Sequence, residues 1–259
     1  MKIAQDVLNV LSHSRVDGHI LYLPPEQLER KLYLDVNKCL ELIGGQWNRK
    51  EKGHVFSSDP SDLLDEMINT GEVTDSKKEF QFFETPKEIV KRMIDYAEIK
   101  PSDSLLEPSA GHGAILDKFP MEHLRCANEL NEESYNFLVK RFHGKAVNIY
   151  NYDFLDPKLY LNPNFPVEFD KIIMNPPFSK GQDVKHIFQA WDILAMGGRL
   201  VSIVSESPFF RENKLSQEFR KWLFDLEDKC QAWVYDLDAG AFKESGTMVK
   251  SRIIVADKR

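Results

Sequence analysis

The sequence has few cysteines, no hydrophobic run long enough for a membrane and no spacing typical of a metal site. Cys39, Cys126 and Cys230 lie far apart with no C-x-x-C pair, and the seven histidines show no paired ligand spacing, which argues against a disulfide framework and a zinc site. Gln5 and Asp6 interrupt the N-terminal segment where a signal peptide would be apolar. No apolar run approaches the ~18 residues of a transmembrane helix. We therefore expect a cytoplasmic protein that holds no metal and does not enter a membrane.

Positive charge is not in excess either. The 34 Lys and Arg residues are outnumbered by 41 Asp and Glu residues, and the formal net charge is −7. Such a chain does not wrap a polyanion over its whole surface, so a nucleic-acid partner would have to meet a local basic face. The length of 259 residues and the apolar content of 42% suffice for one large domain with a smaller one, or for two small domains.

Residues 1–80 show helical periodicity but no alternation of strands and helices, and we expect them to form a separate module. Apolar residues recur at helical spacing from Leu28 to Ile43, and Gly44 and Gly45 end the run as a C-terminal cap would. A second, short helix is predicted for residues 61–69. The expected module is a helix, a hairpin and a helix, an arrangement that resembles half of a winged helix.

The hairpin of this module is predicted for residues 46–56. Two short segments flank a turn that carries Arg49, Lys50 and Lys52. In a winged helix this tip would contact the phosphate backbone, which makes Arg49 and Lys50 candidate nucleic-acid contacts. A charged hairpin that is merely solvated is the alternative.

Residues 81–259 alternate between strand and helix patterns, which predicts an α/β fold with a mostly parallel sheet covered on both faces. Seven apolar runs are predicted as strands, at residues 104–107, 125–129, 147–152, 169–174, 199–204, 232–236 and 252–256. No helical pattern separates the last two runs. They should therefore form an antiparallel pair at the edge of the sheet.

A turn with two glycines follows the first of these strands. It reads Glu107-Pro108-Ser109-Ala110-Gly111-His112-Gly113, and a helix is predicted after it at residues 114–118. A dinucleotide fingerprint would need a small residue where Leu116 stands, and no G-K-[ST] follows for a triphosphate. Glu107 is placed at the strand end, where a carboxylate would hold an ammonium group or a hydroxyl. A plain tight turn is the alternative.

Two further predicted strands also end in acids. Glu129 lies 18 residues after Gly111. This is close to the spacing of ~20 residues at which an acid binds the ribose in doubly wound folds, and its carboxylate can accept from both ribose hydroxyls. Asp153 and Phe154 follow the third strand and offer an acceptor for an exocyclic amine and a ring for a heterocycle. Each acid alone is consistent with a solvated loop carboxylate. Three acids at consecutive strand ends favour a nucleoside site.

The segment Asn175-Pro176-Pro177-Phe178 follows the apolar strand FDKIIM. Two prolines cannot continue a parallel strand, so the chain breaks at the carboxyl edge of the sheet, where α/β folds bind ligands. The Asn175 side-chain oxygen and the Pro176 carbonyl can both accept from a planar amine, which draws the nitrogen towards tetrahedral geometry and frees its lone pair. Phe178 would stack on the ring, a contact worth ~1–3 kcal/mol. The alternative is a stiff loop whose phenylalanine packs inward.

In this order, E-P-S-A-G-H-G, Glu129, Asp153 and N-P-P-F resemble the class I S-adenosylmethionine-dependent methyltransferases that modify N6 of adenine in DNA. The resemblance covers about residues 80–259 and implies a Rossmann-like sheet with strand order 3-2-1-4-5-7-6, its last strand antiparallel. It implies that Glu129 binds the ribose of S-adenosylmethionine. It also implies that the adenine of this cofactor contacts Asp153 and Phe154, and that its methionine part contacts Glu107, Pro108, Ser109, Ala110, Gly111 and Gly113. The catalytic pocket that it implies consists of Asn175, Pro176, Pro177 and Phe178, and Asn175 also borders the cofactor.

The segment F-x-T-P, with Phe83, Thr85 and Pro86, is similar to the one that precedes the glycine turn in this family. Thr85 as N-cap, Pro86 at the first helical position and Glu88 three residues after the cap make a capping box, which predicts a helix start. Helix N-termini attract carboxylates, so these residues are expected to bind the methionine carboxylate. A well-capped surface helix without a ligand is the alternative.

Aromatic and basic residues also gather in two loops at the ligand edge, an arrangement that suits a flipped base. Lys180, after N-P-P-F, is a candidate phosphate contact, although a polar loop is an equal alternative. The loop candidates, each of which a mobile surface loop would also explain, are Phe209, Phe210 and Arg211 after the fifth strand, and Phe242 and Lys243 in residues 239–250.

The leading prediction is methyl transfer to N6 of adenine in double- or single-stranded DNA. The sequence stops after the seventh strand, so we expect short or relaxed sequence specificity, and G-G-x-W-N-R-K is similar to small adenine methyltransferases of phages and mobile elements. RNA methylation at N6-adenine or N2-guanine is the main alternative, followed by cytosine N4 and by protein glutamine, whose enzymes favour Tyr over Phe at the last motif position. A module that binds the nucleoside without turnover is a further alternative, and the oligomeric state is open.

Overall fold

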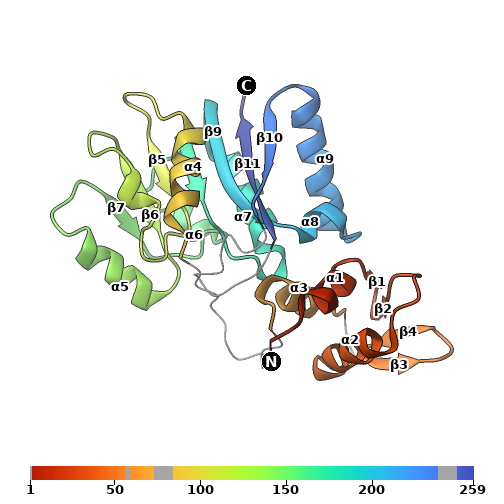
Figure 1. Ribbon diagram of the computed structural model, residues 1–259. Coiled ribbons are helices and arrows are strands. Elements are labelled where there is room, and N and C mark those ends of the chain that lie inside the picture. The colour runs from red at the N-terminus through yellow and green to blue at the C-terminus, as the bar shows by residue number, and fades with distance from the viewer. Residues whose placement is uncertain (1, 57–58, 73–83, 239–249) are drawn as a thin grey trace.

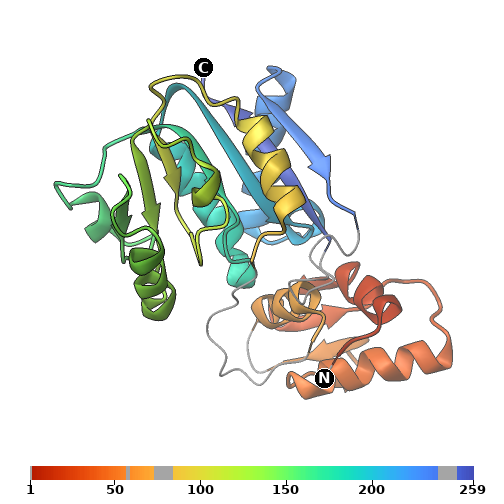
Figure 2. The same ribbon diagram turned by 60° about the vertical axis from the view of Figure 1, so that its left-hand side comes forward.

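The computed structural model describes residues 2–56, 59–72, 84–238 and 250–259, in an N-terminal module and a larger α/β domain (Figure 1). The module lies beneath the sheet of the larger domain, beside the loop that follows β8 (Phe169–Met174) (Figures 1 and 2). Among the described helices, none combines the length and apolar character that a membrane crossing requires.

The larger domain is built on a seven-stranded sheet in the order β10-β11-β9-β8-β5-β6-β7. In the numbering of the predicted strands this is 6-7-5-4-1-2-3, so the expected order is confirmed. Strands β5 to β9 pair in parallel, and β11 is antiparallel to both β9 and β10. Besides β8, the strands are β5 (Leu105–Glu107), β6 (Arg125–Asn128), β7 (Asn148–Tyr150), β9 (Leu194–Ser205), β10 (Ala232–Asp236) and β11 (Ser251–Asp257).

Helices cover both faces of this sheet. Ile172 and Ile173 are neighbours in β8 and both 0% exposed, but they belong to different core clusters because successive strand residues face opposite ways. One cluster includes α7 (Gln182–Asp192) and α9 (Lys214–Asp228), and the other includes α4 (Lys87–Ala97) and α5 (Glu132–Arg141). The short helices α6 (Pro157–Tyr160) and α8 (Ser207–Phe210) lie in the connections.

Strand β9 begins five residues before its predicted start. The extension includes Gly197 and Gly198, whose backbone forms hydrogen bonds with Lys258, directly after β11. A Cβ on Gly198 would lie 2.9 Å from the carbonyl oxygen of Asp170, so glycine permits a close approach to β8 here.

The helix predicted for residues 114–118 is wrong. Only the 3-10 turn η1 (Leu116–Lys118) forms there. Ile115 and Leu116 are 0% exposed and Phe119 is 3% exposed, while Asp117 and Lys118 are exposed, so the apolar residues turn into the core within one short turn.

The capping box predicted before α4 is also wrong. The helix begins at Lys87 with Pro86 as its N-cap, and no side chain bonds to the cap. Thr85 is buried, 7% exposed, and its hydroxyl is bound elsewhere, as described below.

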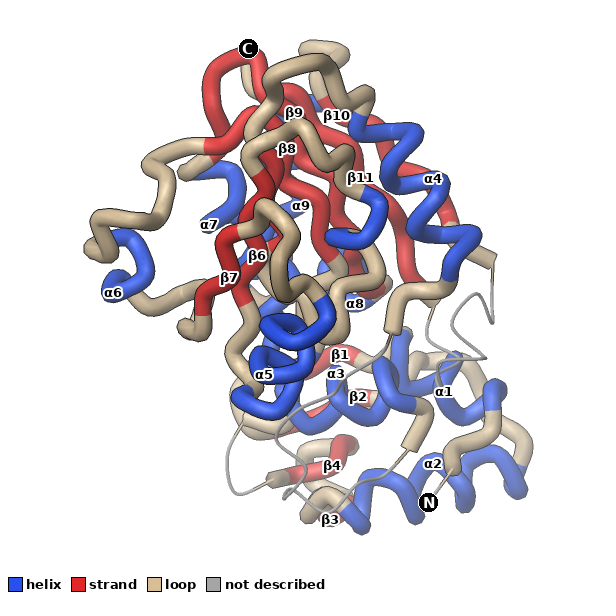
Figure 3. Tube along the Cα trace, turned by 90° about the vertical axis from the view of Figure 1, so that its left-hand side faces the viewer, coloured by secondary structure: helices blue, strands red, loops and turns tan. Residues whose placement is uncertain are grey.

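The N-terminal module contains more structure than its sequence pattern indicated. The expected helix, hairpin and helix are present as α2 (Arg30–Leu42), β3 (Gln46–Asn48) with β4 (Gly53–Val55), and α3 (Ser61–Thr70). Helix α1 (Gln5–Ser12) and the hairpin of β1 (Arg15–Asp17) and β2 (Ile20–Tyr22) are additional, and the strands form one antiparallel sheet in the order β1-β2-β4-β3. Three-residue strands are too short for an alternating pattern, and the equally short β3 and β4 were predicted from the turn between them. Figure 3 shows α1, α2 and α3 around this sheet.

Candidate active site

One buried side chain, Asn128 at the end of β6, connects the carboxyl ends of three strands. Its Nδ2 donates to the carbonyl oxygens of Pro108 (3.1 Å) and Tyr152 (2.9 Å), and its Oδ1 accepts from the Tyr152 N–H (3.2 Å). The side chain is 1% exposed, so leaving these groups unpaired would be costly. Asn128 is absent from the residues predicted by sequence. A signal that could have found it is an amide side chain at the end of a predicted strand, directly before Glu129.

Glu129 joins β6 to the glycine turn. Its Oε2 accepts from the Gly111 N–H at 2.7 Å and its Oε1 accepts from the Asn131 N–H at 2.8 Å. The carboxylate is half-buried, and each of its oxygens has a second lone pair for a ligand hydroxyl. The structure thus brings together Gly111 and Glu129, as their spacing predicted.

Glu107 points into the protein at the end of β5. It is 2% exposed, and its Oε2 accepts from the Leu116 N–H at 2.6 Å. Burial raises the pKa of this carboxyl well above its usual range, and the backbone hydrogen bond from Leu116 opposes that shift only in part. Glu107 therefore shapes the turn from inside and does not extend into open solvent.

The rest of the turn is held from both sides. Ala110 donates its N–H to the Asn128 carbonyl at 3.0 Å, and Ser109 Oγ lies 3.2 Å from Nδ1 of His186 on α7. Burial lowers the pKa of His186 to about 4, so its ring is neutral at pH 7. Gly113 has φ +79°, and a Cβ there would lie 2.8 Å from Leu138 on α5. The turn needs glycine at this position for both reasons.

Asp153 and Phe154 follow β7 but face different surroundings. Asp153 is exposed, and its Oδ1 accepts from the Leu155 N–H at 2.9 Å. Phe154 is 2% exposed, with its ring centroid 5.3 Å from that of His186. This corrects the expectation that Phe154 offers a ring face to a heterocycle, because its ring is covered by the core.

Asn175 is oriented by Thr85. The Asn175 Nδ2 donates to the Thr85 hydroxyl at 3.1 Å, across 90 residues of sequence. Asn175 is half-buried, and with Nδ2 bound to Thr85 its Oδ1 is the acceptor that remains for a ligand amine. The sequence singled out both residues but not their contact.

Phe178 packs inward. It is 9% exposed and belongs to the core cluster that includes α4, while Pro176 before it is buried and Pro177 is half-buried. This is the orientation that the alternative interpretation of N-P-P-F expected. Stacking on a base would require the Phe178 side chain to turn outward.

The residues after β9 correct another expectation. Arg211 is 4% exposed, and its Nε lies 2.8 Å from Oδ1 of Asp65 in α3, so it presents no donor to a polyanion at the surface. Phe209 is half-buried beneath the guanidinium of Arg252, which lies 4.2 Å from the ring centroid. Phe210 is stacked on His13 of the module at 6.3 Å.

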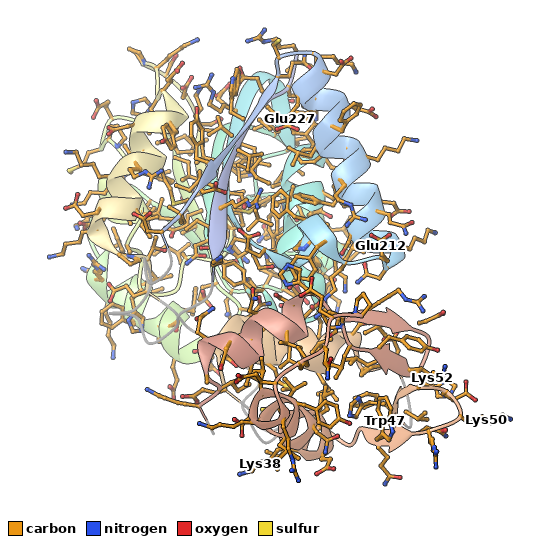
Figure 4. The ribbon with its side chains drawn as sticks, turned by 45° about the vertical axis from the view of Figure 1, so that its right-hand side comes forward. Lys38, Trp47, Lys50, Lys52, Glu212 and Glu227 are labelled. Atoms are coloured by element: carbon orange, nitrogen blue, oxygen red, sulfur yellow. The ribbon has the colours of Figure 1, made fainter. Side chains whose placement is uncertain are left out.

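The remaining basic candidates lie at the surface. Lys180 is exposed, and so are Arg49 and Lys50 at the tip of the β3–β4 hairpin. Figure 4 shows Lys50 and Lys52 extending from this hairpin, with Trp47, which is 47% exposed, at its base. The candidates Phe83, Phe242 and Lys243 fall outside the described residues.

The sheet order is that of the Rossmann-like methyltransferase fold. No family model matches the sequence. The structure is similar to a modification subunit of a putative type I restriction enzyme from Vibrio vulnificus YJ016, with a TM-score of 0.56, 18% identity, and coverage of 91% of this chain and 55% of that one. It is also similar to the type I restriction enzyme EcoKI M protein, with a TM-score of 0.56, 15% identity, and coverage of 99% and 58%.

Among curated proteins, the chain is similar to the type II restriction enzyme and methyltransferase RM.BcgI of Heyndrickxia coagulans. The two are 27% identical over 163 residues, which make up 53% of this chain and 25% of RM.BcgI. The chain thus spans about a quarter of that relative and little more than half of each modification subunit. These three relatives are named as parts of restriction and modification systems, in agreement with the resemblance of the motifs.

Proposed function

We propose that the protein transfers a methyl group from S-adenosylmethionine to the N6 amine of adenine in DNA. The observation that carries this proposal is the orientation of Asn175: Thr85 binds its Nδ2, which leaves Oδ1 as an acceptor at the carboxyl edge of the sheet. An acceptor fixed in this way suits a substrate that presents an N–H donor. The adenine amine is such a donor, with two N–H groups for two acceptors. A substrate methylated on a hydroxyl has one O–H group and would not need both the Asn175 amide oxygen and the Pro176 carbonyl.

The chemical task of the pocket is to make an aryl amine nucleophilic. Its lone pair is delocalised into the ring, so two acceptors that bind the N–H groups, Asn175 Oδ1 and the Pro176 carbonyl, favour the tetrahedral nitrogen of the transition state. When bound, S-adenosylmethionine supplies an electrophilic methyl group on a sulfonium. Glu129 and the turn from Pro108 to Gly113 would hold this cofactor, and Asn175 Oδ1 with the Pro176 carbonyl would hold the amine. The methyl group would pass to the amine nitrogen as the sulfonium becomes a neutral thioether, and the surplus proton of the methylated amine would pass to water.

The residues at the neighbouring strand ends fit this cofactor. Glu129 offers carboxylate lone pairs to ribose hydroxyls while it holds the Gly111 N–H. Asp153 is exposed at the next strand end and offers a carboxylate to an exocyclic amine. We assign ribose contact to Glu129, adenine contact to Asp153, and methionine contact to the turn from Pro108 to Gly113. Because Phe154 is buried beside His186, its role is to support the Asp153 loop from below.

DNA is favoured as the substrate by two considerations. The relatives described above are named for restriction and modification, which concerns DNA. The β3–β4 hairpin also offers Arg49, Lys50 and Lys52 on one exposed turn beside the half-exposed indole of Trp47, a combination of cations and an aromatic ring that suits a nucleic-acid backbone and its bases.

The test is to incubate the protein and labelled S-adenosylmethionine separately with DNA, RNA and bulk protein, and to identify the methylated nucleoside or residue by mass spectrometry. We expect N6-methyladenine in DNA. Asn175→Ala should abolish it while cofactor binding, measured by calorimetry, persists. Asn136→Ala, at an exposed position of α5, is the matched control and should retain activity. N4-methylcytosine, or label in RNA or protein alone, would refute the proposed substrate.

A further inference from the structure

We infer that helix α3 of the N-terminal module holds the catalytic loop in place, with Asn69 and Asp65 as its positioning residues. The module would then contribute to the chemical step itself, apart from any contact that its hairpin makes with DNA. The claim that α3 contributes to the chemical step rests on the proposed function. The claim that α3 holds the loop in place does not.

Asp65 and Asn69 lie one turn apart on α3 and therefore on one face of the helix. Both are buried, at 6% and 1% exposure. Asn69 Nδ2 donates to the backbone carbonyl of Phe178, a long contact of 3.5 Å. Asp65 Oδ1 lies 2.8 Å from Arg211 Nε, in an ion pair with side chains 9% and 4% exposed. The same helix face thus reaches the N-P-P-F motif and the segment after β9, and Figures 1 and 2 both show α3 against this part of the domain.

The other end of the loop is anchored to the sheet by Asp183, the first-turn acid of α7. Asp183 is 0% exposed, and its Oδ2 accepts from both the N–H and the hydroxyl of Ser205, at 3.0 and 2.7 Å. The short segment between Phe178 and Asp183 is therefore fixed by α3 on one side and by β9 on the other.

The backbone between these anchors has an unusual conformation. In η2 (Ser179–Gly181), Lys180 has φ +56° and Gly181 has φ +64°. A non-glycine residue in the left-handed region is strained, and such strain persists only where surrounding contacts determine the conformation. Among the described elements, α3 and α7 both contact the loop here, and a Cβ on Gly181 would lie 2.9 Å from Leu215 of α9.

The consequence for catalysis follows from the position of Phe178. Its carbonyl is the group that Asn69 binds, and it lies three residues after Asn175. A loop freed at Phe178 would let the Pro176 carbonyl and Asn175 depart from the geometry that the transition state needs, and small misplacements of this kind are costly in rate. The strand ends that are proposed to bind the cofactor do not depend on α3. Loss of the α3 contact should therefore lower kcat and leave cofactor affinity unchanged.

The experiment compares Asn69→Leu with Asn9→Leu in the full chain. Leucine keeps the heavy-atom branching of asparagine but removes the donor, and Asn9 is an exposed residue of α1 that serves as the matched control. For Asn69→Leu we expect kcat to fall about tenfold with an unchanged Kd for S-adenosylmethionine, and the amides of residues 178–183 to exchange with solvent about tenfold faster. Asn9→Leu should change none of these.

A second variant tests the ion pair without leaving a charge unpaired. Asp65→Leu combined with Arg211→Met replaces the pair by apolar side chains of similar volume, and it should also accelerate exchange at residues 178–183 while strand β8 stays protected. Unchanged exchange in both variants would overturn the inference, whatever the substrate. Accelerated exchange in a protein whose wild type methylates no DNA would uphold the structural coupling and refute the proposed function instead.

Discussion

The Nδ2 of Asn175 donates to the hydroxyl of Thr85 at 3.1 Å, so a residue two positions before α4 orients the amide that follows β8. This contact replaces the capping role that the sequence suggested for Thr85. It also links the segment before the glycine turn to the candidate catalytic motif. With Nδ2 held by Thr85, Oδ1 is the acceptor of this amide that remains for a substrate amine.

Thr85→Val should therefore impair the chemical step. Valine keeps the shape of threonine but removes the acceptor for Asn175, and loss of one such hydrogen bond, about 1 kcal/mol, corresponds to a fall in kcat of about fivefold to tenfold. Thr85→Ser should retain most of the activity. Steady-state kinetics with saturating DNA would check this. An increase in KM for S-adenosylmethionine at unchanged kcat would instead assign Thr85 to the cofactor.

Phe178 is the residue for which packing and stacking must be separated. Because it is 9% exposed in the core cluster with α4, Phe178→Ala should cost about 3 kcal/mol of unfolding free energy as well as activity. Phe178→Leu should cost less than about 1.5 kcal/mol but still lower kcat, since leucine fills the core without an aromatic face, and Phe178→Tyr should be more active than Phe178→Leu. Urea unfolding and single-turnover kinetics give the two quantities. Equal rates for the leucine and tyrosine variants would contradict stacking.

Asn128 should be important for both stability and cofactor affinity. Asn128→Leu removes the partner of buried groups on Pro108 and Tyr152, so we expect a loss of about 2–4 kcal/mol in unfolding free energy and weaker binding of S-adenosylmethionine. Asn162→Leu is the control: it makes the same substitution at a half-buried position in a loop beyond α6, and it should leave cofactor affinity unchanged. Calorimetric binding at a temperature where the variant is folded checks the second effect. Wild-type affinity in a folded variant would show that Asn128 supports only the fold.

The parts of the structure that the sequence predicted correctly are those that depend on local pattern. Apolar runs such as FDKIIM identified every strand of the large sheet, and Gly111 and Glu129 meet because the ends of adjacent parallel strands meet. Side-chain orientation was not predictable in the same way. Phe154 and Phe178 both follow a strand end, where a ring could face a ligand. Both are buried instead, because Phe154 packs against His186 and Phe178 packs in the core cluster that includes α4.

Buried charges illustrate the same limit. Arg211 stands among aromatic and basic residues in sequence, which suggested a nucleic-acid contact. Its burial depends on Asp65, a residue of another structural part, and no pattern around either residue indicates the pair. The contact between Thr85 and Asn175 is likewise set by tertiary packing. Positions of this kind can be found only when the fold is known.

Two buried groups should give opposing pH dependence of stability. Burial raises the pKa of Asp183 from 3.8 to about 6, so its contribution to stability is complete below pH ~4 and is lost as the pH rises to about 6. Burial lowers the pKa of His186 from 6.5 to about 4, so its contribution is complete above pH ~6.5 and is lost as the pH falls to about 4. Each shift of about two units corresponds to ~3 kcal/mol.

These contributions nearly cancel in the wild type between pH 4 and 6.5. In Asp183→Asn only the histidine term remains, so the unfolding free energy should increase with pH by about 3 kcal/mol relative to the wild type. In His186→Asn only the carboxyl term remains, and the free energy should decrease by a similar amount. Urea unfolding across this pH range is the measurement. Parallel curves for the wild type and both variants would exclude these residues as the titrating groups.

The β3–β4 hairpin should contribute affinity for DNA through phosphate contacts. Arg49→Ala, Lys50→Ala and Lys52→Ala together remove the cations of its tip, while Lys158→Ala removes an exposed cation of α6 as a control. If all three meet phosphates, the dependence of log K on log salt concentration should become shallower by about 2–3, because each contact releases ~0.9 counterion. Fluorescence anisotropy with a labelled duplex, measured at several salt concentrations, gives this slope. Since the hairpin lies on the module and Asn69 contacts the loop from α3, the triple variant should weaken binding but keep kcat at saturating DNA, whereas Asn69→Leu should do the reverse.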